Sequence, residues 1–333
     1  MIFHRLRQVE EEVFWSDCPS RRIIDKVYGK GVRLIVNLTL ECTGYRTPRK
    51  MSVLHYPIPD FSFIPPEEAL YHLVHRISNY IKNGGKVLIH CFGGIGRSGT
   101  TVAMLLIYHY KYSLEDALQK VESLGGGPQC PSQYNAVRWF YRLTNLLDFD
   151  TFQEVYSYAQ SFSFGSGVNH ASTVANIALD VVEALKEKYK LDTKHVLSTY
   201  LAGLLHDIGR RIDASNHHEV GAELVRKNKT INSITDINIV SCAIYHHRTK
   251  TSPEDDVELE EMGFEAKLIS SIIRLSDAFI NVFHGEGSYL GISLDDDHLV
   301  VKDYLVDSER LFKKSKFFTK LTGLEIRLIQ HLL

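Results

Sequence analysis

The sequence has little cysteine, no excess of positive charge and no long apolar run. Five cysteines in 333 residues, irregularly spaced, exclude a disulfide framework, so we expect Cys18, Cys42, Cys130 and Cys242 to be ordinary packed thiols. The formal net charge of -2 at pH 7 argues against a nucleic-acid partner but permits a local basic pocket for phosphate. The longest apolar run, 101–108, is far shorter than the roughly 20 residues of a membrane span.

The length and composition predict a globular chain of two domains. A chain of 333 residues exceeds one ordinary core, and 44% hydrophobic with 23% charged residues is a typical globular balance. The first residues lack the apolar segment of a secretory signal. We therefore expect a soluble, cytoplasmic protein with no membrane partner, and the composition leaves its oligomeric state open.

The first part of the chain alternates strand-like and helix-like stretches. Buried strands are predicted where β-branched and apolar residues run together, at 32–38, 53–56 and 86–90. Helical spacing of apolar residues predicts helices at 66–82, from Ser98 onward, at 113–121 and at 132–146. Strands with helices between them indicate an α/β domain, which we place at residues 1–148.

The second part has a different character. Residues 147–168 include a Ser/Phe/Gly stretch that suits a linker or loop. Periodicity and propensity then predict helices at 171–188, 196–208, 218–227, 236–245 and 265–281. We expect residues 149–333 to form an all-α bundle, with a small hairpin around 293–300.

A cysteine and an arginine frame a glycine-rich loop in the first domain. The predicted strand at 86–90 delivers Cys91 to a loop that opens onto a helix, and Arg97 follows six positions later. Backbone N–H groups of such a loop cradle an anion, and the helix N-terminus stabilises a thiolate nucleophile. The guanidinium of Arg97 can grip two phosphate oxygens. The residues expected to line the phosphate are Phe92, Gly93, Gly94, Ile95, Gly96 and Arg97.

Three further residues complete the expected chemistry. Asp60, on a proline-rich loop, can donate a proton to the leaving alcohol. Ser98 can hydrogen-bond the thiolate as it leaves in the second step, and Gln133 can orient the hydrolytic water. Asp60 also has a plain structural interpretation, since an aspartate after proline is often only a turn residue.

These motifs resemble those of a known family. The segment HCFGGIGRSGT at 90–100 resembles the signature loop of the dual-specificity (cysteine-based) protein phosphatases. The segment 58–60 resembles their general-acid loop, and 127–134 their glutamine-containing loop. The resemblance implies a central, mostly parallel sheet flanked by helices and a two-step reaction through a phosphocysteine. It leaves the substrate open, because the family acts on phosphoproteins, phosphoinositides and RNA 5′ ends.

Histidines and aspartates gather at the predicted helix ends of the second domain. A helical bundle can direct such side chains to one internal point. Imidazole and carboxylate together suit manganese, iron, cobalt, nickel or zinc, and their number suits two ions rather than one. The candidates are His170, His206, Asp207, one of His217 and His218, one of His246 and His247, and Asp277.

The order of these elements resembles that of the HD-domain phosphohydrolases. Residues 204–210 are similar to the defining HD segment, and 217–222 match a His-x-x-x-Gly-Ala element that favours His217 over His218. The resemblance implies the two-metal branch of that family, and we favour His247 within the other pair. Arg210 stands where that branch commonly has lysine and could bind substrate phosphate.

Two functional hypotheses follow from the two halves. In the first, the protein is a bifunctional hydrolase whose metal site cleaves a phosphorylated small molecule or nucleotide and whose cysteine site removes a monophosphate. In the second, it is a protein phosphatase regulated by a ligand that binds the HD half. Its partners would be a phosphorylated small molecule, a phosphoprotein, or both.

Overall fold

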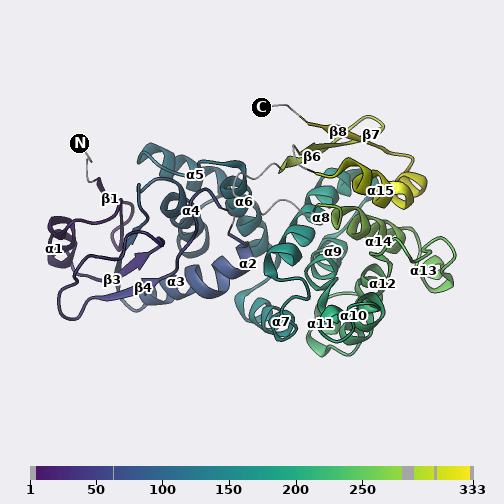
Figure 1. Cartoon of the computed structure of the whole chain (residues 1–333), viewed down its shortest axis with the longest axis horizontal. Coiled ribbons are helices and arrows are strands. Elements are labelled where there is room, and N and C mark those ends of the chain that lie inside the picture. Colours follow the sequence, from purple (N-terminus) through teal and green to yellow (C-terminus); the bar gives the residue numbers. More distant parts are fainter. Residues whose placement is uncertain (1–4, 63, 280–288, 304–305, 331–333) are drawn as a thin grey trace. The chain divides into compact units, whose positions relative to one another are not determined.

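The two parts of the chain fold around different kinds of secondary structure (Figure 1). The computed structural model describes residues 5–62, 64–279, 289–303 and 306–330. These residues divide into two units, of which the first ends at Asn145 and the second begins at Leu146.

The first unit is built on a five-stranded sheet in the order β1-β2-β5-β3-β4. Strands β2, β5, β3 and β4 are parallel, and β1 pairs antiparallel with β2. This confirms the predicted α/β class with a mostly parallel sheet. The strands are β1 Leu6–Gln8, β2 Val13–Ser16, β3 Val32–Asn37, β4 Ser52–His55 and β5 Lys86–His90.

Helices supply the rest of the first unit. The predicted helix at 66–82 consists of three consecutive segments, the middle one wound as a π-helix. Helix α1 was not predicted, because its few apolar residues, Ile23, Ile24 and Val27, lie among charged ones. The elements are α1 Arg21–Gly29, α2 Pro66–Glu68, η1 Ala69–Val74, α3 His75–Lys82, α4 Gly96–Tyr110, α5 Leu114–Ser123 and α6 Pro131–Leu146.

The second unit is mainly helical, as predicted. Its helical elements are α7 Phe149–Ser161, α8 Val168–Tyr189, α9 Thr193–Leu205, η2 Ile208–Arg211, α10 His217–Arg226, α11 Lys229–Ile234, α12 Ile237–His246, α13 Val257–Glu261, α14 Phe264–Ser276 and α15 Ser308–Thr322. The last residues of the helix predicted at 265–281 lie outside the described part of the chain.

Two features of the second unit correct the sequence analysis. Residues 149–161, expected to be linker, form α7, whose first turn is capped by the Asp148 side chain accepting a hydrogen bond from Thr151 N at 3.0 Å. The unit is also not purely helical, because a three-stranded sheet follows α14 in sequence. Its strands are β6 Tyr289–Asp295, β7 His298–Asp303 and β8 Glu325–Ile329.

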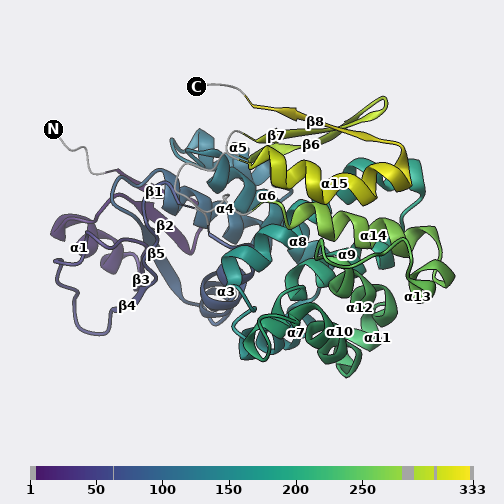
Figure 2. The ribbon, with the colours of Figure 1, turned by 45° about the vertical axis from the view of Figure 1, so that its right-hand side comes forward.

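The hairpin expected around 293–300 is confirmed, because β6 and β7 pair antiparallel. Strand β8 adds to β7 in parallel. Helix α15, which connects β7 to β8, packs against α14 and lies between that helix and the small sheet (Figure 2). Among the described residues, no helix combines the length and the apolar character needed to cross a bilayer.

Candidate functional sites

The central strand of the first unit places the cysteine. Strand β5 lies between β2 and β3 and runs parallel to both, so the carboxyl ends of all three strands meet at one edge of the sheet. Cys91 directly follows β5, and α4 begins at Gly96. The sulfur therefore lies at the bottom of a loop that leads into a helix N-terminus, as the sequence predicted.

Hydrogen bonds point at the sulfur from two sides. Gly94 N donates to Cys91 Sγ at 3.2 Å, and Ser98 Oγ lies 3.1 Å from the same sulfur. Trp15 Nε1 donates to Ser98 Oγ at 2.8 Å, which leaves the hydroxyl hydrogen of Ser98 free to point at the sulfur. Cys91 is only 2% exposed. These donors stabilise a negatively charged sulfur.

The loop is held in a conformation that needs glycine. Gly94 has φ +64°, and a Cβ there would lie 2.4 Å from the backbone nitrogen of Asp17. Arg7 Nη1 donates to the Gly94 carbonyl at 3.0 Å and so helps to hold the loop in place. Phe92 and Gly93 are exposed, while Ile95 is half-buried and Gly96 is buried. The exposed part of the loop is where a phosphate group can enter.

Arg97 connects this loop to two others. Its side chain is 2% exposed, and its Nη1 donates to the carbonyl of Ile58 at 3.0 Å. Its Nε lies 3.2 Å from Asp60 Oδ1, and the Asp60 side chain is 56% exposed. The structure thus brings the candidate proton donor to the candidate phosphate-binding group.

Glu41 is a part of this site that the sequence did not indicate. Arg97 Nη2 donates to Glu41 Oε1 at 2.6 Å. The hydrogen bond from Arg97 holds the pKa of Glu41 below its usual value, so Glu41 is charged. A glutamate between two predicted elements carries no sequence signal, and only the tertiary fold places it on the guanidinium.

Gln133 and His90 are buried residues next to the loop. Gln133 is buried, its Oε1 accepts a hydrogen bond from Gln129 N at 2.9 Å, and a Cβ on Gly96 would lie 2.9 Å from that oxygen. His90 Nε2 lies 2.8 Å from Tyr45 Oη. Burial lowers the pKa of His90 to about 4, so its imidazole is neutral and shapes the loop rather than carrying a charge.

The expectation of unpaired packed thiols is wrong for Cys18 and Cys42. These residues are joined by a disulfide, with their Cα atoms 6.1 Å apart, while Cys130 is a free thiol and Cys242 a buried one. Cys18 N also donates to the Phe92 carbonyl at 2.9 Å. The two cysteines meet because β2 and β3 end at the same edge of the sheet. Their irregular spacing in the sequence gave no indication of this pairing.

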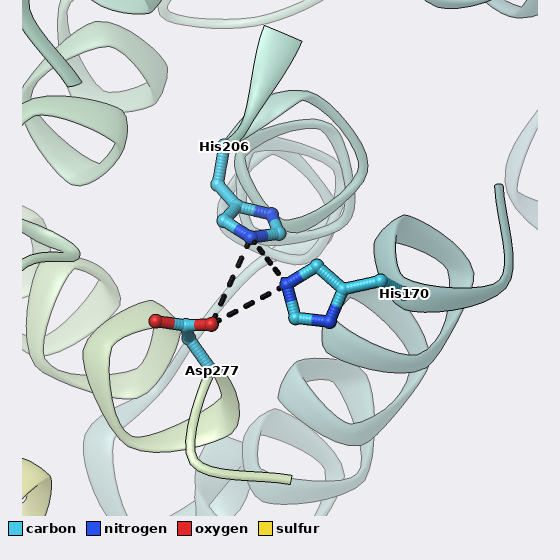
Figure 3. A group of neighbouring side chains, drawn as sticks. All are labelled: His170, His206 and Asp277. Carbon is cyan, nitrogen blue, oxygen red and sulfur yellow. Dashed lines mark hydrogen bonds and ion pairs between the residues drawn. The ribbon is translucent and has the colours of Figure 1, made fainter. Parts of the chain in front are cut away.

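The second unit gathers its histidines and aspartates into two groups of three. The first group consists of His170 on α8, His206 after α9 and Asp277 after α14 (Figure 3). His170 Nε2 lies 3.1 Å from His206 Nε2, and Asp277 Oδ1 lies 3.4 Å and 3.9 Å from these two nitrogens. Three donor atoms face one point, as ligands of a single ion do.

The second group consists of Asp207, His217 and His247. His217 Nε2 lies 3.1 Å from His247 Nε2, and Asp207 Oδ1 lies 3.2 Å and 3.7 Å from these two nitrogens. Asp207 also faces the first group, because its Oδ2 is 3.7 Å from both His170 Nε2 and His206 Nε2. One carboxylate therefore stands between the two groups, which is the arrangement that two bridged ions require.

The residues around Asp207 keep it in this position. Ser166 Oγ donates a short hydrogen bond to Asp207 Oδ2. Gly165 has φ +71°, and a Cβ there would lie 1.9 Å from the carbonyl oxygen of Asp207. Burial would raise the pKa of Asp207, but the nearby His206 and His247 lower it to about 2. The carboxylate is thus ionised and available to a cation.

The imidazole rings have the tautomer that a metal needs. In three of them Nδ1 lies close to a backbone carbonyl: His206 to Gly203 O at 2.7 Å, His217 to Ala214 O at 2.8 Å and His247 to Ile244 O at 2.6 Å. Nδ1 therefore carries the proton, and Nε2 presents a lone pair to the centre. Burial lowers the pKa of all three rings, which keeps them neutral. This donor set fits divalent transition metals.

Neither of the two neighbouring histidines joins these groups. His246 Nε2 lies 3.1 Å from Asp256 Oδ2, and His218 stacks on Tyr245 with its Nε2 3.6 Å from Glu219. His246, which we counted among the candidate ligands, is thus turned away from the centre, because adjacent residues at a helix end point in different directions. The structure places His217 and His247 in the groups, the members that we favoured.

Three cationic side chains border the metal groups. Arg210 Nε lies 3.8 Å from Asp207 Oδ2, and its side chain is 43% exposed, so it can reach a substrate phosphate. Lys314 and Arg310, both on α15, contact Asp277. Lys314 belongs to a run of charged residues at 313–316, a pattern that usually forms a solvated helix face, but its own side chain is buried.

Comparison with known proteins gives each unit a family. The sequence model described as "Dual specificity phosphatase, catalytic domain" matches residues 16–135, and the one described as "HD domain" matches residues 167–281. The order of the two matches is the order in which the sequence motifs occur.

Individual relatives match part of the chain. "Cyclin-dependent kinase inhibitor 3" of Rattus norvegicus is 32% identical over 116 residues, which are 30% of this chain and 52% of that protein. "Tyrosine-protein phosphatase CDC14" of Saccharomyces cerevisiae is 22% identical over 222 residues, 65% of this chain and 37% of that protein. The solved structure of Tk-PTP in its active form is 29% identical and covers 41% of this chain and 96% of that one, with a TM-score of 0.37. The chain spans about half the length of the first of these relatives.

Proposed function

Because the chain carries a dual-specificity phosphatase catalytic domain ahead of an HD domain, we propose that it is a bifunctional phosphate-ester hydrolase. We assign residues 1–148 to the cysteine-dependent activity and 149–333 to the metal-dependent one. The observation that supports the proposal is that the candidate catalytic residues of each unit lie close to one another. In one unit Ser98 contacts the Cys91 sulfur and Asp60 contacts Arg97, and in the other Asp207 belongs to one metal-ligand group and faces the second.

In the first unit Cys91 is the nucleophile. Its thiolate attacks phosphorus while the loop N–H groups and Arg97 hold the phosphate oxygens, and a phosphocysteine forms as the ester bond breaks. Asp60, beside Arg97, gives its proton to the leaving alcohol oxygen. Water, oriented by Gln133, then attacks phosphorus and gives a proton to the Asp60 carboxylate. The P–S bond breaks, and Ser98 donates its hydrogen bond to the departing thiolate. The products are the alcohol and inorganic phosphate.

In the second unit His170, His206 and Asp277 would hold one divalent ion, and Asp207, His217 and His247 would hold the other. Two such ions, of manganese, iron, cobalt, nickel or zinc, supply positive charge to phosphate oxygens and lower the pKa of bound water. Asp207 faces both groups and fixes their separation. Arg210, half-exposed beside Asp207, binds the phosphate group of the substrate.

The substrates we propose differ between the units. Relatives of the chain include a tyrosine-protein phosphatase and a "Phosphatidylglycerophosphate phosphatase PTPMT2" from Arabidopsis thaliana, and by their names they act on a phosphoprotein and a phospholipid. We propose a phosphoprotein or small phosphomonoester for the cysteine site. For the metal site we propose a phosphorylated small molecule or nucleotide. We propose that the protein acts in the cytoplasm, without a nucleic-acid or membrane partner.

Removal of metal separates the two activities. We expect protein treated with EDTA to lose hydrolysis of nucleotides and sugar phosphates and to recover it with Mn²⁺, because within the described residues the groups that could hold a metal ion all lie in the second unit. Hydrolysis of aryl phosphates should persist in EDTA, since Cys91 needs no ion. Phosphate release from a panel of both substrate classes measures this. If every activity survived EDTA, the HD half would be a regulatory module of the phosphatase instead.

A further inference from the structure

Helix α15 contributes a buried lysine to the metal groups from outside the HD match. That match ends at residue 281, whereas α15 spans Ser308–Thr322. Lys314 is only 7% exposed, while Lys313 and Lys316 on the same helix are exposed. A lysine is buried at a cost in free energy unless it has a charged partner. The partner of Lys314 is a candidate metal ligand.

Lys314 contacts the ends of two helices that carry ligands. Its Nζ forms a short ion pair with Asp277 Oδ2 and donates to the carbonyl of His247 at 3.3 Å. Asp277 follows the last residue of α14, and His247 follows the last residue of α12. Arg310, one turn earlier on α15, donates from Nη2 to the Asp277 carbonyl at 2.6 Å. The positive charges thus also stabilise the carboxyl ends of these helices.

The two oxygens of the Asp277 carboxylate face different groups. Oδ1 faces His170 Nε2 at 3.4 Å and His206 Nε2 at 3.9 Å, on the side of the metal group, and Arg310 Nη2 lies 3.4 Å from the same oxygen. Oδ2 faces Lys314. A carboxylate without such a partner can turn both oxygens to a cation, so the lysine limits what Asp277 can offer.

We propose that Lys314 is a positioning residue of the metal centre, which holds the second oxygen of Asp277 so that this ligand serves an ion through Oδ1 alone. This inference rests on the proposed function of the second unit. The charge of Lys314 also opposes a cation in the His170, His206 and Asp277 group. The segment beyond the HD match is therefore part of the metal centre. The charge of Lys314 lowers the affinity of the centre for one ion, and it adds to the positive charge that attracts an anionic substrate.

Titration of metal-free, full-length protein with Mn²⁺ tests this role. We expect Lys314→Met and Lys314→Gln to bind one ion at least about tenfold more tightly than wild type, because the repulsion is lost and Oδ2 is released. Lys316→Gln, a neutral change at an exposed position of the same helix, should leave both affinities unchanged. Thermal unfolding of the metal-free variants shows whether each is folded, and the glutamine variant, which also lacks the positive charge, carries the test if the methionine is not tolerated.

The alternative outcomes are distinct. A lysine that only stabilises helix ends would give a lower melting temperature with Mn²⁺ affinity unchanged or weaker, and either result overturns the proposal. Wild-type protein that binds no Mn²⁺ would refute the metal centre itself, and this inference with it. Binding by wild type with no tightening in the neutral Lys314 variants would refute only the role of Lys314.

Discussion

Replacing Cys91 with serine will lower the hydrolysis of p-nitrophenyl phosphate by at least about a thousandfold. A serine hydroxyl is not ionised at neutral pH in the position where Gly94 N and Ser98 now stabilise the sulfur. The variant should still bind phosphate or vanadate, because Arg97 and the loop N–H groups are unchanged. Initial rates and oxyanion binding, measured side by side, separate lost chemistry from lost binding.

Cys242→Ser is the matched control for this experiment. Cys242 is a buried free thiol in the other unit, and burial raises its pKa to about 11, so it is unreactive at neutral pH. Its removal should leave aryl-phosphatase activity intact. Full activity of Cys91→Ser in the presence of a chelator would rule out the cysteine mechanism.

Replacing Asp207 with alanine will weaken metal binding at least about a hundredfold and abolish the metal-dependent activity. The reason is its position between the groups, with Oδ1 near His217 and His247 and Oδ2 near His170 and His206. Loss of one side chain therefore damages both ion sites. Metal content after gel filtration and release of phosphate from nucleotides and sugar phosphates measure the effect.

His246→Gln is the control for the metal centre, because His246 is as buried as His247 but faces Asp256. This variant should keep its metal. The aryl-phosphatase activity of Asp207→Ala should equal that of wild type. If Asp207→Ala lost no activity of its own and only altered hydrolysis at Cys91, the HD half would bind a regulatory ligand rather than hydrolyse a substrate.

The class of each unit could be predicted from local patterns. A buried strand, a glycine-rich loop and a helix follow one another in sequence, so residues 86–110 specify their own arrangement. The metal ligands stand at helix ends, where spacing and residue type already indicate a common centre. Within the pairs, the His-x-x-x-Gly-Ala element favoured His217, and the orientation of the ring is then fixed by the Ala214 carbonyl.

What could not be predicted depends on contacts between distant segments. Glu41 reaches Arg97 only because β3 and β5 are neighbours in the sheet, and the same edge brings Cys18 to Cys42. Lys314 reaches Asp277 only because α15 returns to pack on α14. The two residues of each contacting pair lie more than 20 positions apart in the sequence. No short motif therefore contains both. Helix α7 was missed for a local reason, its unusual share of aromatic residues.

The hydrogen bond between Trp15 and Ser98 gives the protein an optical probe of its own chemistry. Ser98 also contacts the Cys91 sulfur, so the indole lies two hydrogen bonds from the atom whose charge changes during the reaction. The chain has only one other tryptophan, Trp139, which is buried within α6. Tryptophan emission followed on the millisecond scale can therefore distinguish the arrival of phosphate on sulfur from its later departure, without any label attached to the protein.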